Sequence, residues 1–313
     1  MFNIIKHRNI FYAISLALIV PGLIALVLWG LNPSIDFTGG SLLDLRFNNP
    51  TTAPTTIAVR EVLETLGYQG SAVQLSDDNS VLIRVSEINT DQKNEIESLL
   101  QERFGGELIE QRFEAVGPAV GNQVTQGAVF AVFAATFGIL GYLYFAFRDV
   151  PNTLRYGIAT ITAMLHDVLI VLGLAALAGR FLGWQVDALF LTALLTVIGF
   201  SVHDSIVVFD RVRENSTVMK GKSFEEIVNH SLVQTLDRSL NTQMTALFTL
   251  TAILLFGGGP IRQFVAWLLV GIVSGTYSSI FNAAPIVVSW ENGDFARLFG
   301  RKPKAKQQAS VSS

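Results

Sequence analysis

The 313-residue chain contains no cysteine, which excludes disulfide scaffolds, thiolate metal sites and cysteine nucleophiles. Charge is also scarce: 15% of the residues are Asp, Glu, Lys or Arg, whereas soluble chains carry about a quarter. Hydrophobic residues make up 50% of the chain, and the mean hydropathy is +0.45. The sequence also has no phosphate-binding glycine loop, zinc-ligand spacing or nucleophilic triad. A cytosolic enzyme is therefore excluded, and neither a cofactor nor a metal ion is expected.

Long apolar runs are what the chain does have. An α-helix needs about 20 apolar residues to cross the ~30 Å hydrocarbon core of a bilayer. Six stretches meet this requirement, at 10–31, 125–147, 156–178, 187–209, 240–257 and 264–289. A cytoplasmic helix is also expected near 212–237, and a capping-box pattern, Ser223 with Glu226, predicts that it runs from about 224 toward the fifth stretch. The chain is therefore predicted to be a polytopic α-helical membrane protein in a lipid bilayer.

The basic residues predict the orientation, because Lys and Arg gather in short cytoplasmic loops. Fourteen of them fall on one side of the six stretches, and only Arg180 and Arg262 fall in short loops on the other. Both termini are therefore expected in the cytoplasm. Residues 33–122 carry fourteen Asp and Glu against six Lys and Arg, a net charge of −8, which makes nucleic acid an unsuitable partner. The expected organisation is a first span within 1–31, an extracytoplasmic domain at 32–122, a five-helix bundle at 123–290 and a basic cytoplasmic tail at 291–313.

The outer segment has the pattern of a small α+β domain. In SLLDLRF (41–47) the apolar residues alternate with polar ones, as they do in a half-buried strand. Helices are expected from Pro54 to Gly67 and from a cap at Thr90 to Gly105. Further strands are expected near 72–76, 81–85 and 107–116. The resulting order β-α-β-β-α-β predicts a ferredoxin-like domain.

Two carboxylates interrupt the apolar spans, where each costs about 2.5 to 3.5 kcal/mol to insert and is a functional candidate. Asp167 lies near mid-membrane in the third span, and Asp204 lies about 10 Å from the cytoplasmic end of the fourth. Ser201 shares a helix face with Asp204. The neighbouring His203 is a candidate proton carrier because imidazole titrates near ~6.5. Helix packing is the alternative for His203, and simple hydrogen bonding to neighbours, together with His166, is the alternative for Asp167.

A polar stripe follows Arg238 along the fifth span, formed by Asn241 or Thr242, Thr245 and Thr249. With Asp204, these groups could carry a proton or cation across part of the membrane. Movement of Arg238 relative to Asp204 would switch that carboxyl between its protonated and ionised forms. The alternative is that Asp204 and Arg238 form a fixed ion pair that fastens two helices.

Four strings of the sequence resemble the SecD/SecF family, which is related to the resistance-nodulation-division transporters. They are IDFTGGS (35–41), LHDVLIVLG (165–173), GFSVHDSIVVFDRVREN (199–215) and TLDRSLNTQMT (235–245). The resemblance covers the whole chain. It implies an auxiliary subunit of the Sec translocase in the bacterial inner membrane, which uses the proton-motive force to drive late steps of preprotein export. The partners it implies are SecD, the SecYEG translocon, YajC, YidC and the translocating preprotein.

The resemblance also implies roles for particular residues. The intramembrane carboxylate motif falls on Asp204, and the arginine motif of the fifth span falls on Arg238, Asn241 and Thr242. The D-F-x-G-G motif, with an implied hinge role, falls on Asp36, Phe37, Gly39 and Gly40. Two positions depart from the family pattern: His203 stands where Asn is usual, and Ser239 stands where Thr is common.

Two other functions would fit a chain of this kind. A half-sized exporter of small molecules or lipids would need a substrate-sized apolar pocket, of which the acidic outer segment gives no sign. A scaffold that only holds other membrane proteins would tolerate neutral, size-matched replacement of Asp204 and Arg238 as a pair.

Overall fold

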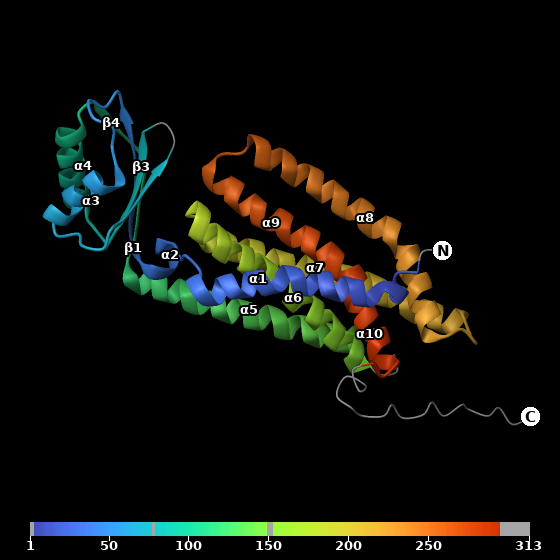
Figure 1. Cartoon of the computed structure of the whole chain (residues 1–313). Helices are drawn as coiled ribbons and strands as arrows, with labels where there is room; N and C mark the ends of the chain where they lie inside the picture. The colour runs from blue at the N-terminus through green and yellow to red at the C-terminus, as the bar shows by residue number, and fades with distance from the viewer. Residues whose placement is uncertain (1–2, 77–78, 149–152, 295–313) are drawn as a thin grey trace, which may run out of the picture. The chain divides into compact units, whose positions relative to one another are not determined.

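The computed structural model describes residues 3–76, 79–148 and 153–294. In this part of the chain, six helices are long and apolar enough to cross a membrane, by length and composition. They are α1 (Arg8–Trp29, after a 3₁₀ turn at Ile5–His7), α5 (Pro118–Ala146), α6 (Thr153–Leu182), α7 (Ala188–Val218), α8 (Phe224–Phe256), and α9 (Gly259–Ser278) continued through a π-helical turn (Ser279–Ala283) into α10 (Ala284–Glu291) (Figure 1). The prediction of a six-helix membrane protein is confirmed. The predicted basic tail lies, from residue 295 on, outside the described residues.

The connection between the fourth and fifth spans is mostly helical. Residues 212–218 belong to α7, which continues to Val218, and α8 begins at Phe224 and runs into the fifth span, as the capping box predicted. The predicted capping box is present, with Ser223 Oγ accepting from Glu226 N at 3.3 Å and Glu226 Oε2 accepting from Ser223 N at 3.0 Å. No glycine or proline occurs between Phe224 and Phe256. Since nothing in this segment breaks a helix, α8 runs unbroken from its cap through the apolar stretch.

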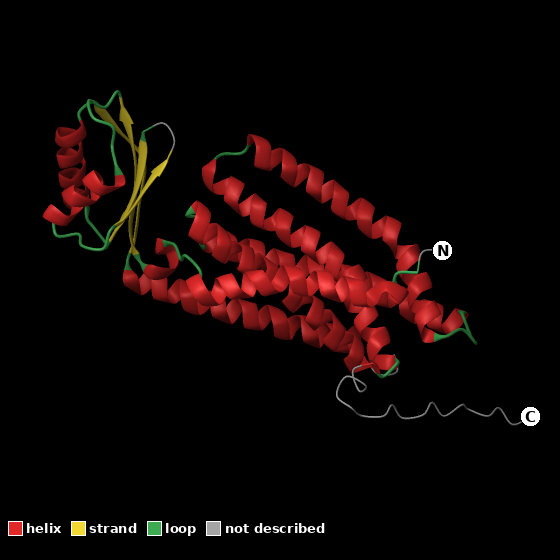
Figure 2. Ribbon diagram, viewed as in Figure 1, coloured by secondary structure: helices red, strands yellow, loops and turns green. Residues whose placement is uncertain are grey.

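The segment between α1 and α5 folds as a four-stranded antiparallel sheet with two helices. Its elements, after the short helix α2 (Ile35–Thr38), are β1 (Gly40–Asn48), α3 (Thr56–Thr65), β2 (Ala72–Ser76), β3 (Ser80–Val85), α4 (Thr90–Phe104) and β4 (Glu107–Val116). The strand order is β2-β3-β1-β4, and α3 and α4 cover one face of the sheet (Figure 2). This order and connectivity confirm the ferredoxin-like prediction.

The core of this domain follows the predicted alternation. Leu43, Leu45 and Phe47 on β1 are fully buried against residues of α3 and α4. The predicted cap of α4 at Thr90 is wrong by one residue, because Asn89 is the N-cap. Its side chain accepts from Gln92 N at 2.9 Å, and the Gln92 side chain accepts from Asn89 N. Asn is a better N-cap than Thr, and this choice places Gln92 at the third helical position of a capping box.

The chain divides into two compact units. One unit holds residues 1–30, 134–176 and 192–313, and the other holds 31–133 and 177–191. In the first, Phe147, Tyr156 and Phe209 form a cluster in which the Phe147 and Tyr156 rings stack at 5.8 Å and Phe209 meets Tyr156 edge-on at 5.1 Å. In the second, α5 up to Phe133 and α6 from Leu177 belong with the sheet.

Helices α1 and α6 approach closely where two glycines meet. A Cβ added at Gly173 would lie 2.5 Å from the Cα of Gly22, a distance that backbone atoms cannot accommodate without moving. Close contact of this kind stabilises helix pairs in a bilayer, where apolar burial gives no net driving force.

Replacing Gly173 by Val should separate α1 from α6 and destabilise the bundle by about 1 to 3 kcal/mol, the usual cost of overpacking. The measurement is the thermal unfolding midpoint of the purified protein in detergent. Gly157→Val is the matched control, because Gly157 is on the same helix and a Cβ there meets nothing within 4 Å. Equal midpoints for the two variants would contradict the importance of this contact.

Candidate functional site

The first candidate site surrounds Asp204 on α7. Its side chain is buried, and only 3% of the residue is exposed. Gln243 on α8 donates from Nε2 to Asp204 Oδ2 at 2.6 Å, while Gln243 Oε1, also buried, has no hydrogen-bond partner among the described residues. The predicted intramembrane carboxylate is therefore held by an amide of the next helix.

The expected pairing of Asp204 with Arg238 is not formed in the part of the chain that the structure describes. Arg238 is exposed on α8, and no ion pair joins it to Asp204. Ser239, the next residue, is buried instead. Because successive helical residues point about 100° apart, the face of α8 that turns toward α7 carries Ser239 and Gln243 rather than Arg238.

The predicted polar stripe is not on this buried face of α8. Asn241, Thr242, Thr245 and Thr249 are all exposed. His203 on α7 is exposed as well, with 64% of its side chain accessible, and its Nδ1 lies 3.6 Å from Asp204 Oδ1. These polar side chains, which we call the exposed polar band, lie in the candidate membrane spans α7 and α8, and no other part of the described chain covers them.

Sequence reasoning missed Gln243. The signal that could have found it is a second polar series on α8, since Thr235, Ser239 and Gln243 recur every four residues and are all buried. A four-residue period marks one helix face. The stripe that begins at Arg238 was the more conspicuous of the two.

The second candidate site surrounds Asp167 on α6, which is completely buried. Ser274 Oγ donates to Asp167 Oδ1 at 2.6 Å and Ser278 Oγ donates to Asp167 Oδ2 at 2.6 Å. His166 Nδ1 lies 2.9 Å from Asp167 Oδ1. Three groups from two helices therefore surround one carboxylate. Neither serine of α9 was predicted, since isolated serines are common in membrane helices.

Ser201 lies beside this second site. Its side chain is buried, and its Oγ has no hydrogen-bond partner within the described residues. A Cβ added at Gly275 on α9 would lie 3.5 Å from Ser201 Cβ and 3.7 Å from Asp167 Oδ2. Gly275 of α9 therefore packs at ordinary contact distance against both α7 and α6, and Ser201 lies near Asp167 on a helix that also carries Asp204.

The D-F-x-G-G motif forms a tight corner in the second compact unit. Gly39 has φ +71° and Gly40 has φ +119°, which side chains rarely adopt. A Cβ at Gly40 would lie 2.7 Å from Val85 O, and one at Gly39 would lie 2.9 Å from Pro118 Cα. Both glycines therefore allow close packing at the start of β1 and of α5. The hinge role remains a prediction.

Asp36 of the same motif caps α7, because its Oδ2 accepts from Ala188 N at 2.9 Å. Phe37 contributes its carbonyl oxygen, which accepts from Thr125 Oγ1 at 3.4 Å. Asp187 also lies at this helix end, where its Oδ1 accepts from Phe190 N at 2.7 Å. Burial raises the pKa of Asp187, and the negative charge of Asp36 raises it further.

Asp187→Asn should stabilise the protein near neutral pH. A raised pKa means that Asp187 binds its proton more tightly in the folded chain than in the unfolded one, so stability falls as the pH rises from 3.8 through the raised value. Asn keeps the N-cap and removes the charge. The unfolding midpoint of Asp187→Asn should exceed that of the wild type at neutral pH, and the gain should vanish below pH 3.8. A gain that is constant with pH would contradict this account.

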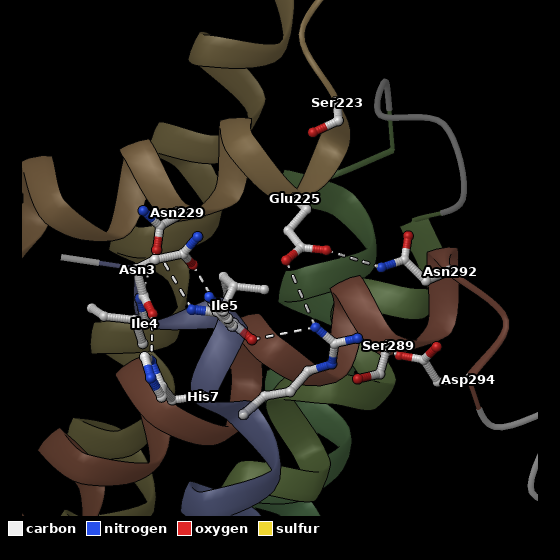
Figure 3. Close-up of polar contacts among 12 residues, drawn as sticks. Asn3, Ile4, Ile5, His7, Ser223, Glu225, Asn229, Ser289, Asn292 and Asp294 are labelled. Atoms are coloured by element: carbon white, nitrogen blue, oxygen red, sulfur yellow. Dashed lines mark hydrogen bonds and ion pairs between the residues drawn. The ribbon is translucent and has the colours of Figure 1, made fainter. Parts of the chain in front are cut away.

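A third polar cluster joins the N-terminal residues to α8 and α10 (Figure 3). Asn229 Oδ1 accepts from Ile4 N at 2.8 Å, and Asn292 Nδ2 donates to Glu225 Oε2 at 3.3 Å. Arg8 pairs with Asp294 at 2.8 Å. An adjoining cavity of about 590 Å³ is lined by both acidic and basic side chains, including Lys222, Glu226 and His230. Its mixed charge selects no class of ligand, so we interpret the cluster as a structural contact that joins the start of α1 to α8 and to the end of α10.

Comparison with known proteins shows that the chain is similar to protein-export membrane proteins. A family model for the C-terminal part of the protein export membrane proteins SecD and SecF matches residues 95–293, and a model for the SecD/SecF GG motif matches residues 26–51. The protein translocase subunit SecF of Thermobaculum terrenum is 50% identical over 97% of this chain and 99% of its own length. The SecF subunit of Anaerolinea thermophila is 48% identical over the same shares of the two chains.

Two solved structures that match are longer than this chain. The crystal structure of SecDF from Thermus thermophilus, described as a translocon-associated membrane protein, is similar with a TM-score of 0.80 at 34% identity. The match covers 93% of this chain and 39% of that one. A second SecDF structure matches with a TM-score of 0.67 at 32% identity, over 96% of this chain and 40% of that one.

Proposed function

The chain belongs to the SecD/SecF family of protein-export membrane proteins, and from this we propose that it uses the proton-motive force, together with a SecD partner, to drive late steps of preprotein export. Its many-helix membrane architecture and its place among translocase subunits follow from the family and the fold. The proton coupling, the partners and the orientation are what the proposal adds. In the proposed orientation, both termini lie in the cytoplasm and the sheet domain lies on the opposite side of the inner membrane.

The observation that carries the proposal is the contact between Asp204 and Gln243. Gln243 Nε2 donates to Asp204 Oδ2 at 2.6 Å, a bond that an ionised carboxylate accepts, and the buried Gln243 Oε1 has no partner among the described residues. A protonated Asp204 could donate to Oε1 once the amide rotates by half a turn, because an amide is both donor and acceptor. The same pair of side chains can thus hold either form of the carboxyl. A site whose only role was to hold α7 against α8 would need hydrogen-bond partners for only one of these two forms of the carboxyl.

Arg238 is the positive charge that moves relative to Asp204 during the proposed cycle. It is exposed in the structure and separate from Asp204. Its approach to Asp204 in another conformation would favour the ionised carboxylate and release the proton. The proposed pathway includes His203, Asn241 and Thr242 on the exposed polar band, with Asp167 and Ser201 deeper in the bundle.

The exposed polar band also supports a membrane partner. Polar groups facing lipid are costly because hydrocarbon offers no hydrogen bonds. We infer that SecD covers the band formed by His203, Arg238, Asn241, Thr242, Thr245 and Thr249. A similar protein of Thermus thermophilus is named SecDF, and this chain matches only 38% of it, which leaves room for a SecD half in the same polypeptide. SecYEG, YajC, YidC and the preprotein are further partners that the proposal expects.

The partner face can be tested because the chain has no cysteine of its own. Thr242→Cys and Thr249→Cys, each labelled with a benzophenone maleimide and irradiated in membranes, should form an adduct with SecD. Leu18→Cys is the control, since Leu18 is an exposed apolar residue of α1 and should react with lipid instead. A SecD adduct at Leu18 but at neither threonine would contradict the assignment of the face.

The function itself is tested in sealed inverted vesicles that contain the translocon and SecD. Adding this chain should increase the fraction of a preprotein that completes translocation, and a protonophore should remove the increase without affecting ATP-driven initiation. Stimulation that survives the protonophore would overturn the proton-coupled function and leave a scaffold.

A further inference from the structure

Arg84 of β3 is a cation without a counter-ion in the described part of the chain. Its Nε is buried and has no hydrogen-bond partner there. The residue is partly exposed, and its two Nη atoms, which also lack a partner among the described residues, are not buried. Lys93 and Arg112 of the same domain, by contrast, each pair with a glutamate. Burial lowers the pKa of the Arg84 guanidinium, but arginine is not deprotonated in proteins. A bound anion would therefore offset the cost of this unpaired charge.

Arg84 lines a pocket of about 300 Å³ at one end of the sheet. Ala72 of β2, which is directly opposite Arg84 across the strand pair, lines the pocket as well. Opposite residues of an antiparallel pair point to the same face of a sheet, so the Arg84 side chain lies on the side of the pocket. Thr38 and Gly39 of the D-F-x-G-G motif form another part of the wall. The pocket thus lies between the motif and the ends of β2 and β3.

The charge of the pocket favours an anionic ligand. Arg84 is the one charged residue among the described residues of its wall, which also includes Tyr68, Gln69 and Ser86. The side chains of these three residues can donate hydrogen bonds, and a guanidinium matches both oxygens of a carboxylate. The net charge of −8 over residues 33–122 repels polyanions. A single carboxylate therefore suits the pocket better than a nucleic acid or a polyphosphate does.

The pocket lies at the beginning of an edge strand. The strand order is β2-β3-β1-β4, so within this sheet β2 pairs only with β3. Ala72, Gln74 and Leu75 of β2 are exposed. The free side of an edge strand presents backbone donors and acceptors to which an extended peptide can add as a further strand. Because Ala72 begins β2 and also lines the pocket, a peptide along this edge would bring one of its side chains close to Arg84.

We propose that the Arg84 pocket binds the carboxylate of an acidic side chain in an extended peptide that pairs with the edge of β2. The two Nη groups of Arg84 donate to the two carboxylate oxygens, and the unpaired cation becomes half of an ion pair. The backbone of the peptide supplies affinity, and the pocket selects Asp or Glu. The identity of this peptide as a translocating preprotein rests on the proposed function, whereas the preference for a carboxylate does not.

The test is fluorescence anisotropy of dye-labelled peptides added to the full chain in lipid nanodiscs. One probe is a short peptide rich in Thr and Val with a central Glu, and the other has Gln in its place. We expect the Glu peptide to bind about tenfold more tightly, which corresponds to about 1.4 kcal/mol. Arg84→Gln should remove this preference. Arg60→Gln is the matched control, since Arg60 is an exposed arginine of α3 in the same domain, and it should keep the preference. A preference that is absent from the wild type, or that survives Arg84→Gln, overturns the proposal.

The contribution of the guanidinium is separated from that of charge and folding by Arg84→Lys. This variant keeps the charge but not the two-pronged geometry, so the preference should fall without vanishing. Arg84→Gln should unfold at a temperature no lower than the wild type does, because Arg84 has no partner in the described chain to lose. A lower midpoint for Arg84→Gln, together with a full preference in Arg84→Lys, would contradict the assignment of Arg84 as the binding group.

Two further probes test the extended peptide. The Glu peptide with methylated backbone amides cannot pair with a strand edge and should bind more weakly. Free acetate should displace the Glu peptide only at much higher concentrations than the peptide itself requires. Equal binding of the methylated peptide, or equally strong binding of acetate, would overturn the pairing with β2. These measurements need neither SecD nor a proton gradient, so their result is independent of whether protons drive export.

Discussion

Asp204→Asn is expected to abolish the proton-dependent part of export while the subunit still folds and assembles with SecD. Asn has nearly the same shape as Asp and can still accept a hydrogen bond from Gln243 Nε2, so the contact between α7 and α8 should persist. It cannot ionise, so no proton can be loaded or released at this position. The measurement is the translocation yield in sealed vesicles with an imposed proton gradient, compared with and without a protonophore.

Asp210→Asn is the matched control for this experiment. Asp210 is on the same helix, but its side chain is 65% exposed and lies 3.8 Å from Arg213. The control should keep full gradient-dependent stimulation. If Asp204→Asn also kept full gradient-dependent stimulation, the carboxyl would have no role in proton transfer. The contact with Gln243 would then serve only to hold α7 against α8. The driving force makes the expected loss measurable, because one charge crossing 100 mV yields about 2.3 kcal/mol.

The double variant Ser274→Ala with Ser278→Ala is expected to destabilise the protein severely. It removes two hydrogen bonds from a completely buried carboxylate. Hydrogen bonds to charged groups contribute about 1.5 to 3 kcal/mol each, so the loss should reach roughly 3 to 6 kcal/mol. The unfolding midpoint in detergent and the rate of proteolysis report this loss.

A further substitution separates the loss of hydrogen bonds from the loss of packing. Adding Asp167→Asn to the double variant should recover part of the stability, because the buried charge is then gone. Ser279→Ala is the control, since Ser279 is also buried on this segment but donates only to the Thr276 carbonyl of its own helix at 3.1 Å. If the double variant were no less stable than Ser279→Ala, Asp167 would not depend on these serines.

The sheet domain and the spans were predictable because each rests on a local signal. Alternation along β1 shows which side chains enter the core, and the length of an apolar run shows which helices can cross a bilayer. The end of a helix is also local, as the capping box of Ser223 and Glu226 illustrates. The bounds near 212–237 were less predictable, because hydropathy does not reveal that α7 extends beyond its apolar stretch to Val218.

The sequence by itself determined the family, the six membrane helices, the ferredoxin-like domain and the presence of carboxylates at Asp167 and Asp204. These follow from composition, periodicity and rare polar residues, all of which are properties of the linear chain. The partners of those carboxylates were decided only by the tertiary structure. Asp204 meets Gln243 rather than Arg238, and Asp167 meets two serines of α9. The physical reason is that the rotation of one helix against another depends on side-chain packing along the whole contact, including close approaches such as Gly22 to Gly173, which no local pattern encodes.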